Sequence, residues 1–383
     1  MKKKFFYNFH KIDLRDIKEV VKSLKGEKIT KGKYLDLFEK KLSLYLGSKY
    51  CLATSNATSA FDIVISSLKM NKSEIAILSP NTFVAAANSL KKFKKNFVFC
   101  DIKIDDPNID TKKLENEIVD QRKKGKKVKL VVVTDYSGLP ADWKELRRLK
   151  KKYDFKLIND NCHALGSLYF NDKFYALKYA DIVIQSFHAV KNITTSEGGA
   201  ILTNEKKLYQ DFSKLREHGF VKKNYWEYDL DNPGFNSRLS EMQCALGFSQ
   251  LKKLNKFLRK RKQIANFYNN YFKKYKFIKT PTIDKNKSSA HHLYYLRVNF
   301  KKMKISKSSF FKKLIKDNIF LQIHYIPTYR FSAYKDLYKK NKFKNNEKFY
   351  HEVFSIPLYV DLHKKDLKFI CSRIIKNLCR TSI

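Results

Sequence analysis

The chain has 383 residues, of which 43% are hydrophobic and 14% aromatic, with 80 Lys and Arg against 37 Asp and Glu. This length allows two domains and this apolar fraction allows a sizeable core, so a disordered chain is excluded. Eleven glycines and seven prolines exclude collagen-like and low-complexity chains. No apolar run approaches the roughly 20 residues that span a bilayer, and residues 1–16 lack the apolar stretch of a secretion signal. We therefore expect a cytoplasmic protein with no membrane partner.

The formal net charge of +43 raises the question of a nucleic-acid partner. Only 12 of the 80 basic residues are Arg, the side chain that grips phosphates in a fork, and the lysines are spread over nearly every segment. This distribution predicts a solvated lysine-rich surface and no nucleic-acid partner, while attraction of anionic substrates stays open. The six cysteines show no metal-ligand spacing, so we expect reduced thiols and no metal site.

The first two thirds of the chain alternate helical and strand patterns. Apolar positions at helical spacing predict helices over 13–25 and 34–46, the second ending at Gly47. Short apolar runs then predict seven buried strands, at 50–54, 74–80, 96–102, 128–136, 155–160, 181–187 and 199–204. Helical patterns lie between several of them, at 59–68, 82–92 and 142–152. This alternation predicts an α/β fold with a mostly parallel sheet covered on both faces and ligands at the carboxyl ends of its strands.

The last third predicts a different architecture. A long helical pattern over 239–275 leads into a smaller α+β domain with strands at 294–300 and 319–325, a helix near 307–318 and a final helix. We therefore expect a large domain at 1–250, which includes an N-terminal substrate segment at 1–33, and a small C-terminal domain at 251–383.

Three polar features follow predicted strands. The small residues at 55–60 open a helix whose free N–H groups could bind an anion, although an ordinary capped helix would look the same. Asp160 leaves a buried strand and needs a cationic partner such as a protonated pyridine nitrogen, unless it is a plain loop residue. Lys191 follows another strand, where a buried amine can form a Schiff base. Together, in this order, they match the requirements of pyridoxal 5′-phosphate (PLP).

Several motifs carry a resemblance to a known family, from ITKGKYLDLFEKKLSLYLGSKY near the start to FSIPLYVDL near the end. They are SNATSA, SPNTFVAAAN, DNCHALGS, SFHAVKNITTSEGGAI, LREHGF, GFNSRLSEMQCALGFSQLKKL and IHYIPTY. The chain resembles the DegT/DnrJ/EryC1/StrS family of fold-type I PLP-dependent aminotransferases, which act on nucleotide-linked keto-sugars.

The resemblance implies roles around the cofactor. Lys191 would carry it as a Schiff base and shuttle protons, Asp160 would pair with the pyridine nitrogen, and His163 would contact the ring or its 3-oxygen. Phe83 would stack on one ring face, with a core aromatic as the competing interpretation. The remaining implied cofactor contacts are the phosphate ligands Ala57, Thr58 and Ser186, and Asn236, which the family supplies from the neighbouring subunit of a homodimer.

The sugar-nucleotide contacts that the resemblance implies are Tyr7, Lys28, Ile29, Thr30, His188, Glu197, His324 and Tyr325, and for each of them a purely structural role is equally compatible with the sequence. Two positions depart from the family wording: Cys162 replaces a small Ser or Ala, and Asn192 replaces a proline that some relatives carry. Dehydratase relatives carry His in place of the Schiff-base lysine. Since Lys191 is present, transamination is favoured over dehydration.

The implied reaction moves an amino group from L-glutamate to the C4 ketone of a UDP-linked 4-keto-6-deoxy-N-acetylhexosamine, as in the branch of the family that serves pseudaminic acid biosynthesis. One alternative is another nucleotide keto-sugar, the precursor of bacillosamine or legionaminic acid or a dTDP-sugar. A non-catalytic nucleic-acid-binding relative and a PLP-dependent racemase or lyase acting on amino acids are further alternatives that the motifs favour less.

Overall fold

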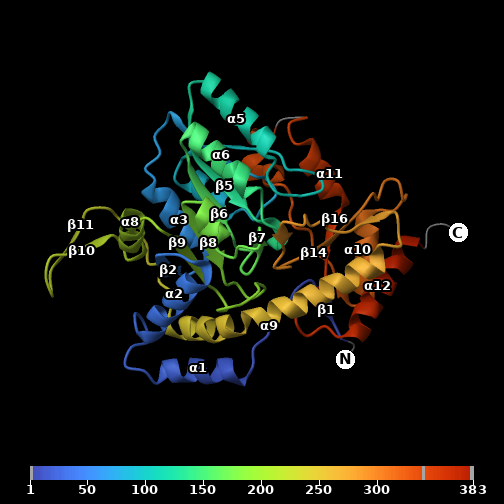
Figure 1. The fold of residues 1–383 in the computed structure, drawn as a ribbon, viewed down its shortest axis with the longest axis horizontal. Coiled ribbons are helices and arrows are strands. Elements are labelled where there is room, and N and C mark those ends of the chain that lie inside the picture. The colour runs from blue at the N-terminus through green and yellow to red at the C-terminus, as the bar shows by residue number, and fades with distance from the viewer. Residues whose placement is uncertain (1–2, 339–340, 380–383) are drawn as a thin grey trace.

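The structure is a computed structural model that describes residues 3–338 and 341–379. Its centre is a seven-stranded sheet (Figure 1), in which β9 runs antiparallel to both neighbours and the strands from β8 to β4 are parallel. The strand order is β2 (Tyr50–Thr54), β9 (Gly199–Thr203), β8 (Ile182–Ser186), β6 (Lys156–Asp160), β5 (Lys127–Thr134), β3 (Glu74–Leu78) and β4 (Asn96–Phe99). The predicted seven-stranded, mostly parallel sheet is therefore confirmed.

Helices cover both faces of this sheet because its strands are apolar on both sides. In β5, Val131 and Val133 pack into one core cluster, while Leu130 and Val132 pack into the other. The first cluster is completed by α2 (Lys33–Leu46), α5 (Thr111–Lys123), α6 (Trp143–Tyr153) and α7 (Tyr175–Tyr179). The second is completed by α3 (Ala57–Ser67), α4 (Ala85–Lys92) and α8 (Lys206–Arg216).

Helix ends follow local sequence signals. Asp13 caps α1 (Leu14–Leu24) in a capping box with Asp16, and Gly47 ends α2 in the left-handed conformation with φ +69°. Two helices that the apolar periodicity did not reveal, α5 and α8, expose much of their surface and carry several lysines.

The smaller C-terminal layer has its own core. A three-stranded sheet of β12 (Ile278–Lys279), β14 (Tyr294–Val298) and β16 (Val353–Ile356) packs with α10 (Lys307–Lys316) and α12 (Lys364–Cys379). The N-terminal β1 (Phe5–Phe6) joins this layer by pairing with β15 (Ile319–Phe320). The strand expected over 319–325 stops at Phe320, because beyond it only an isolated bridge from Gln322 to Ser355 continues the pairing.

The long helix α9 (Glu241–Phe272) connects the two layers, and in Figure 1 it runs above α1 across the lower part of the molecule. Ser240 and Gln243 form its capping box. Its first half, down to Phe257, packs into the core beneath the large sheet, and its second half, from Ile264, packs into the core of the small layer. The boundary expected at residue 250 stays a prediction, and residues 380–383 of the expected small domain lie outside the described chain.

Shorter elements complete the described part of the chain. A hairpin of β10 (Phe220–Lys222) and β11 (Tyr228–Leu230) projects from the molecule (Figure 1), with its side chains largely exposed. Helix α11 (Lys344–Glu352) and three 3₁₀ turns, at Tyr136–Gly138, Thr328–Arg330 and Ser332–Leu337, lie beside the sheet termini. The described helices include none that is long and apolar enough to cross a membrane.

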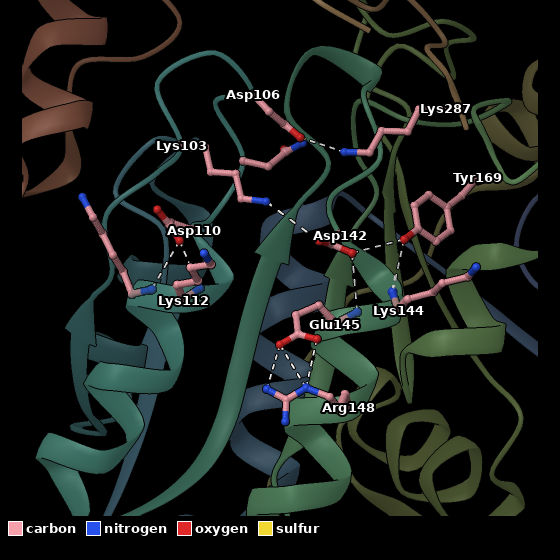
Figure 2. Close-up of polar contacts among 12 residues, drawn as sticks. Lys103, Asp106, Asp110, Lys112, Asp142, Lys144, Glu145, Arg148, Tyr169 and Lys287 are labelled. Atoms are coloured by element: carbon pink, nitrogen blue, oxygen red, sulfur yellow. Dashed lines mark hydrogen bonds and ion pairs between the residues drawn. The ribbon is translucent and has the colours of Figure 1, made fainter. Parts of the chain in front are cut away.

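Strand pairing and side-chain contacts join the small layer to the large one near the carboxyl ends of the strands. Strand β13 (Lys287–Ser288) pairs with β7 (Leu168–Tyr169), and Lys287 Nζ lies 2.7 Å from the Asp106 carboxylate (Figure 2). In the same view, Asp142 accepts a hydrogen bond from the Tyr169 hydroxyl at 3.3 Å. These contacts hold the segment before β14 on the large domain, which fixes one wall of the cavity described next.

Candidate active site

A cavity of about 910 Å³ opens at the carboxyl ends of the parallel strands, where the sequence predicts a site. Its walls come from the large sheet, the N-terminal segment and the stretch that follows β15. The predicted site residues that line it are Tyr7, Ala57, Thr58, Phe83, Asp160, His163, Ser186, His188, Lys191, Glu197, His324 and Tyr325.

Lys191 lies in the tight turn that follows β8. Its backbone N–H donates to the carbonyl of His188 at 2.9 Å, and the next segment returns as β9. Burial lowers the pKa of its ammonium group, while the neighbouring Cys162 and Asp160 act in the opposite direction. Because a larger fraction of a low-pKa lysine is the free amine, Lys191 is suited to act as a nucleophile.

Asp160 is the last residue of β6 and is 7% exposed. Its carboxylate accepts hydrogen bonds from the Thr134 hydroxyl at 2.9 Å, the Thr82 hydroxyl at 3.3 Å and the Cys162 N–H at 3.3 Å. These partners are all neutral. A carboxylate held at a cavity wall by neutral donors leaves room for a cation inside the cavity.

The N-terminus of α3 forms the third part of the site. Asn56 caps the helix by accepting from Ser59 N–H at 2.8 Å. The Ser186 hydroxyl lines the same cavity. Strand β9 approaches this helix end so closely that a Cβ on Gly199 would lie 2.6 Å from the Ala57 nitrogen. The glycine therefore lets the end of β8, with Ser186, share a wall with the first helical turn, an arrangement suited to an anion.

Histidines and a tyrosine make up the opposite wall. The Ser137 N–H donates to His163 Nδ1 at 3.3 Å, and His163 Nε2 lies 2.8 Å from the Tyr325 hydroxyl. Burial lowers the pKa of His163 well below its usual value, with Lys191 and His324 adding to the effect. Burial also lowers the pKa of His324 to about 3. Both imidazoles are therefore neutral hydrogen-bonding groups at physiological pH.

The mouth of the cavity carries Phe83 and a contact between His188 and Glu197. Phe83 is 59% exposed, so the interpretation as a core aromatic is wrong. Its ring centroid lies 6.3 Å from that of Tyr325. His188 Nε2 lies 3.6 Å from the Glu197 carboxylate, and both side chains are about half exposed.

Four predicted residues do not line the cavity of the single chain. Lys28, Ile29 and Thr30 form an exposed turn before α2, and Asn236 is exposed beyond the hairpin. Their expected contacts with substrate and with the neighbouring subunit's cofactor stay predictions.

The cavity also contains residues that the sequence did not indicate. His292 is 2% exposed and its ring centroid lies 4.4 Å from that of His163. Thr82, which donates a hydrogen bond to the Asp160 carboxylate, lines the cavity, as does Gln322 shortly after β15. A histidine pair at 291–292 was the available signal for His292, whereas Thr82 lies inside a quoted motif. Within the described residues, no group of three or more side chains is placed to bind a metal ion.

A buried network supports the loop that leaves Asp160. Asn161 Nδ2 donates to the Asp135 carboxylate at 3.0 Å, which also accepts from the Tyr175 hydroxyl at 2.7 Å and the indole of Trp143 at 2.9 Å. Burial raises the pKa of Asp135 to about 6, although these hydrogen bonds act against the rise. Asp135 therefore takes up a proton in the folded protein at a pH where an unfolded chain has released it.

We expect this carboxyl to make stability pH-dependent. Between about pH 4 and 6 the folded state holds a proton that the unfolded state has lost, so the contribution of Asp135 to the free energy of unfolding falls as the pH rises. Asp135→Asn removes that slope. The stability difference between wild type and variant, measured by urea unfolding, should therefore shrink by on the order of 2–3 kcal/mol across this range.

The exposed Asp154→Asn is the matched control, since its side chain is 94% exposed. Its stability difference from the wild type should not change over the same pH range. Parallel stability curves for the wild type and Asp135→Asn would contradict the shifted pKa.

Comparison with known proteins identifies the family and the fold. Residues 10–375 match the DegT/DnrJ/EryC1/StrS aminotransferase family. A Campylobacter jejuni UDP-4-amino-4,6-dideoxy-N-acetyl-beta-L-altrosamine transaminase is 40% identical over 364 residues, which are 95% of each chain. The structure of Helicobacter pylori PseC, an aminotransferase of pseudaminic acid biosynthesis, superimposes with a TM-score of 0.91 at 34% identity, covering 98% of this chain and 99% of PseC.

The PLP form of a putative sugar aminotransferase from Streptococcus pneumoniae superimposes with a TM-score of 0.89 at 25% identity, covering 99% of each chain. The family match spans nearly the whole chain, and the conclusion on family rests on it together with the relative at 40% identity. The chain belongs to the DegT/DnrJ/EryC1/StrS aminotransferase family, with the fold-type I architecture that the sequence predicts.

Proposed function

We propose that the protein uses PLP to transfer an amino group from L-glutamate to the C4 ketone of a UDP-linked 4-keto-6-deoxy-N-acetylhexosamine. The product would be UDP-4-amino-4,6-dideoxy-N-acetyl-β-L-altrosamine, an intermediate of pseudaminic acid biosynthesis. The observation that carries the proposal is a single cavity that combines an amine of lowered pKa, a buried carboxylate with neutral partners and a helix N-terminus.

The residues present fit PLP. Lys191 would attach the cofactor aldehyde, the Asp160 carboxylate would receive the protonated ring nitrogen, and the start of α3 with Ser186 would hold the phosphate. The first two N–H groups of a helix have no partner inside the helix, and Asn56 caps a later one. When bound, PLP supplies an electron sink that stabilises negative charge at the carbon losing its proton.

The remaining chemistry belongs to this chain. The Lys191 amine, which lines the cavity, would take the α-proton of glutamate and later deliver a proton to C4 of the sugar. The neutral His163 and Tyr325 are hydrogen-bonded to each other. Neither places a second positive charge beside Lys191. At the mouth, His188 and Glu197 can contact hydroxyl or amide groups of the sugar.

The sugar-nucleotide assignment draws on the relatives. The Campylobacter jejuni transaminase named above is 40% identical over 95% of its length, and in this chain Tyr7, His324 and Tyr325 line the same cavity as Lys191. Whichever sugar nucleotide is bound, the many lysines of the chain favour its anionic diphosphate. A cytoplasmic location would supply both the sugar nucleotide and glutamate.

We further propose that the enzyme works as a homodimer. Asn236 is exposed and does not line the cavity of its own chain. It is therefore free to contact the cofactor phosphate in the partner subunit. The projecting hairpin of β10 and β11 exposes Trp226 by 77% and Tyr228 by 60%. Large exposed aromatic side chains of this kind are typical of interfaces.

The test presents the PLP-loaded protein with L-glutamate and three keto-sugars, and follows amino-sugar formation by NMR. The three are the UDP-linked β-L-arabino 4-keto sugar, its C5 epimer with the D-xylo configuration, and a dTDP-linked 4-keto-6-deoxyglucose. The proposal predicts fastest turnover of the first. Preference for the D-xylo epimer would favour a bacillosamine or legionaminic acid precursor, and preference for the dTDP-sugar would favour that branch.

A further inference from the structure

An arginine is buried close to the residues that line the cavity. Arg261, on the second half of α9, is 1% exposed. Its Nη1 donates to the backbone carbonyls of Leu358 at 3.0 Å and of His291 and His292 at 3.3 Å. Within the described residues no carboxylate oxygen lies within 4.0 Å of this guanidinium. A buried charge satisfied only by neutral oxygens is costly, and an apolar side chain at this stripe position of α9 would avoid the cost.

The guanidinium fixes the orientation of one buried amide. Arg261 Nη2 donates to Asn8 Oδ1 at 2.9 Å, and Asn8 is 3% exposed. Since an arginine can only donate, the oxygen of the amide must face it and the NH₂ group must point away. The backbone N–H of Phe9 donates to the same oxygen at 2.9 Å, which supports this assignment.

The NH₂ group of the Asn8 amide donates hydrogen bonds to two segments that line the cavity. Asn8 Nδ2 donates to the Val190 carbonyl at 2.7 Å and to the His292 carbonyl at 3.2 Å. Val190 directly precedes Lys191, and the His292 ring packs against His163. A path of hydrogen bonds therefore runs from the Arg261 charge through one amide to the peptide group that carries the lysine.

We propose that Arg261 and Asn8 are positioning residues that hold the Lys191 turn against the His292 segment, and so set where the lysine amine lies in the cavity. The inference rests on the proposed function, because it gives a role in that reaction to residues that do not touch the reacting atoms. Its structural part, control of the turn at 188–195, can be measured without cofactor.

The decisive variant is Asn8→Asp. A carboxylate still accepts from Arg261 and from the Phe9 N–H, but it donates nothing to the Val190 and His292 carbonyls. The ion pair that the buried guanidinium gains offsets the loss of two hydrogen bonds and the repulsion between the new carboxylate oxygen and the two carbonyl oxygens. Because small displacements of a reacting group are costly, the glutamate half-reaction should slow by about ten- to one hundred-fold.

Two readouts separate positioning from stability. The first is backbone hydrogen exchange of the cofactor-free protein, which should rise over residues 188–195 in Asn8→Asp and stay unchanged in the core strands. The second is the rate at which the protein captures PLP, followed by absorbance, which should fall at a temperature where the variant, by its own melting curve, is fully folded. The matched control is Asn96→Asp, which makes the same change at an exposed amide that donates to the Lys72 carbonyl at 2.8 Å.

A second variant keeps the proposal testable if Asn8→Asp does not fold. Arg261→Met removes the charge that orients the amide, and it should also raise exchange over 188–195. In the double variant the two effects on residues 188–195 should add only in part, because Arg261 reaches Val190 through the Asn8 amide while it also bonds the His291 and His292 carbonyls directly. Wild-type exchange over 188–195 together with wild-type PLP capture in a folded single variant would overturn the proposal, as would exchange that rises equally throughout the protein.

The outcome also separates this inference from the proposed function. If the wild-type protein captures no PLP but Asn8→Asp still loosens residues 188–195, the proposed function is wrong and the control of the turn by Asn8 remains. If the wild type captures PLP normally and the variants behave like it in both readouts, the proposed function stands and the positioning role is wrong.

Discussion

Replacing Lys191 by alanine is expected to prevent covalent capture of PLP and to abolish turnover. The variant removes the amine that lies at the end of β8 with a lowered pKa, in the cavity shared with Asp160. Loss of a positioned proton-transfer group alone costs on the order of 10²–10⁴-fold, and loss of the attachment point adds to it. Borohydride reduction followed by peptide mass spectrometry should find the cofactor on Lys191 of the wild type and on no peptide of the variant.

Lys191→Arg is the matched control, since it keeps a positive charge but cannot form the covalent linkage. It should be as inactive as the alanine variant. Added methylamine should restore part of the half-reaction to Lys191→Ala, because a small free amine can replace the missing proton carrier. An alanine variant that retains more than a tenth of wild-type turnover would contradict the assigned role.

Asp160→Asn should lower the rate of the glutamate half-reaction by about 10²–10³-fold while leaving the cofactor attached. The amide has nearly the same shape, but it carries no negative charge that would hold a proton on the ring nitrogen of a bound cofactor. Rapid mixing with glutamate measures this rate directly. The Thr134 and Thr82 hydroxyls, at 2.9 and 3.3 Å from the carboxylate, can still bond the amide oxygen.

Asp135→Asn is the control for Asp160→Asn, because it removes the charge of a buried carboxylate that would not contact the ring nitrogen. Asp135 is also fully buried in this part of the sheet, yet it bonds Asn161, Tyr175 and Trp143 and does not line the cavity. Its effect should appear mainly in stability. Equal losses of rate in the two variants, or a loss of less than threefold in Asp160→Asn, would contradict a direct contact of Asp160 with the cofactor.

The central sheet could be predicted because its strands are continuous apolar runs separated by helical patterns. The run at 128–136 predicts β5, whose residues alternate between two buried faces. The cavity residues at strand ends could also be predicted, because parallel strands bring their carboxyl ends to one edge of the sheet. The hairpin at 220–230 could not be predicted, because its side chains are mostly exposed and no apolar alternation marks it.

The buried polar residues could not be predicted for a different reason. Arg261 stands in the basic stretch LRKRKQ and looks like part of a solvated face. The structure places it in line with Phe257, Ile264 and Tyr268 on the buried stripe of α9. Spacing from those apolar residues was a usable signal for its burial. Asn8 had no signal, because its partners Val190 and His292 are far away in the sequence.

The most direct measurement of the central claim is the visible absorbance spectrum of the purified protein with PLP, taken before and after L-glutamate and again after the UDP-linked β-L-arabino 4-keto sugar. We expect a band of lysine-attached cofactor that glutamate converts to the pyridoxamine form and that the keto-sugar restores. If no band forms even with excess PLP, or if glutamate leaves the band unchanged, the assignment of this cavity as an aminotransferase site is wrong.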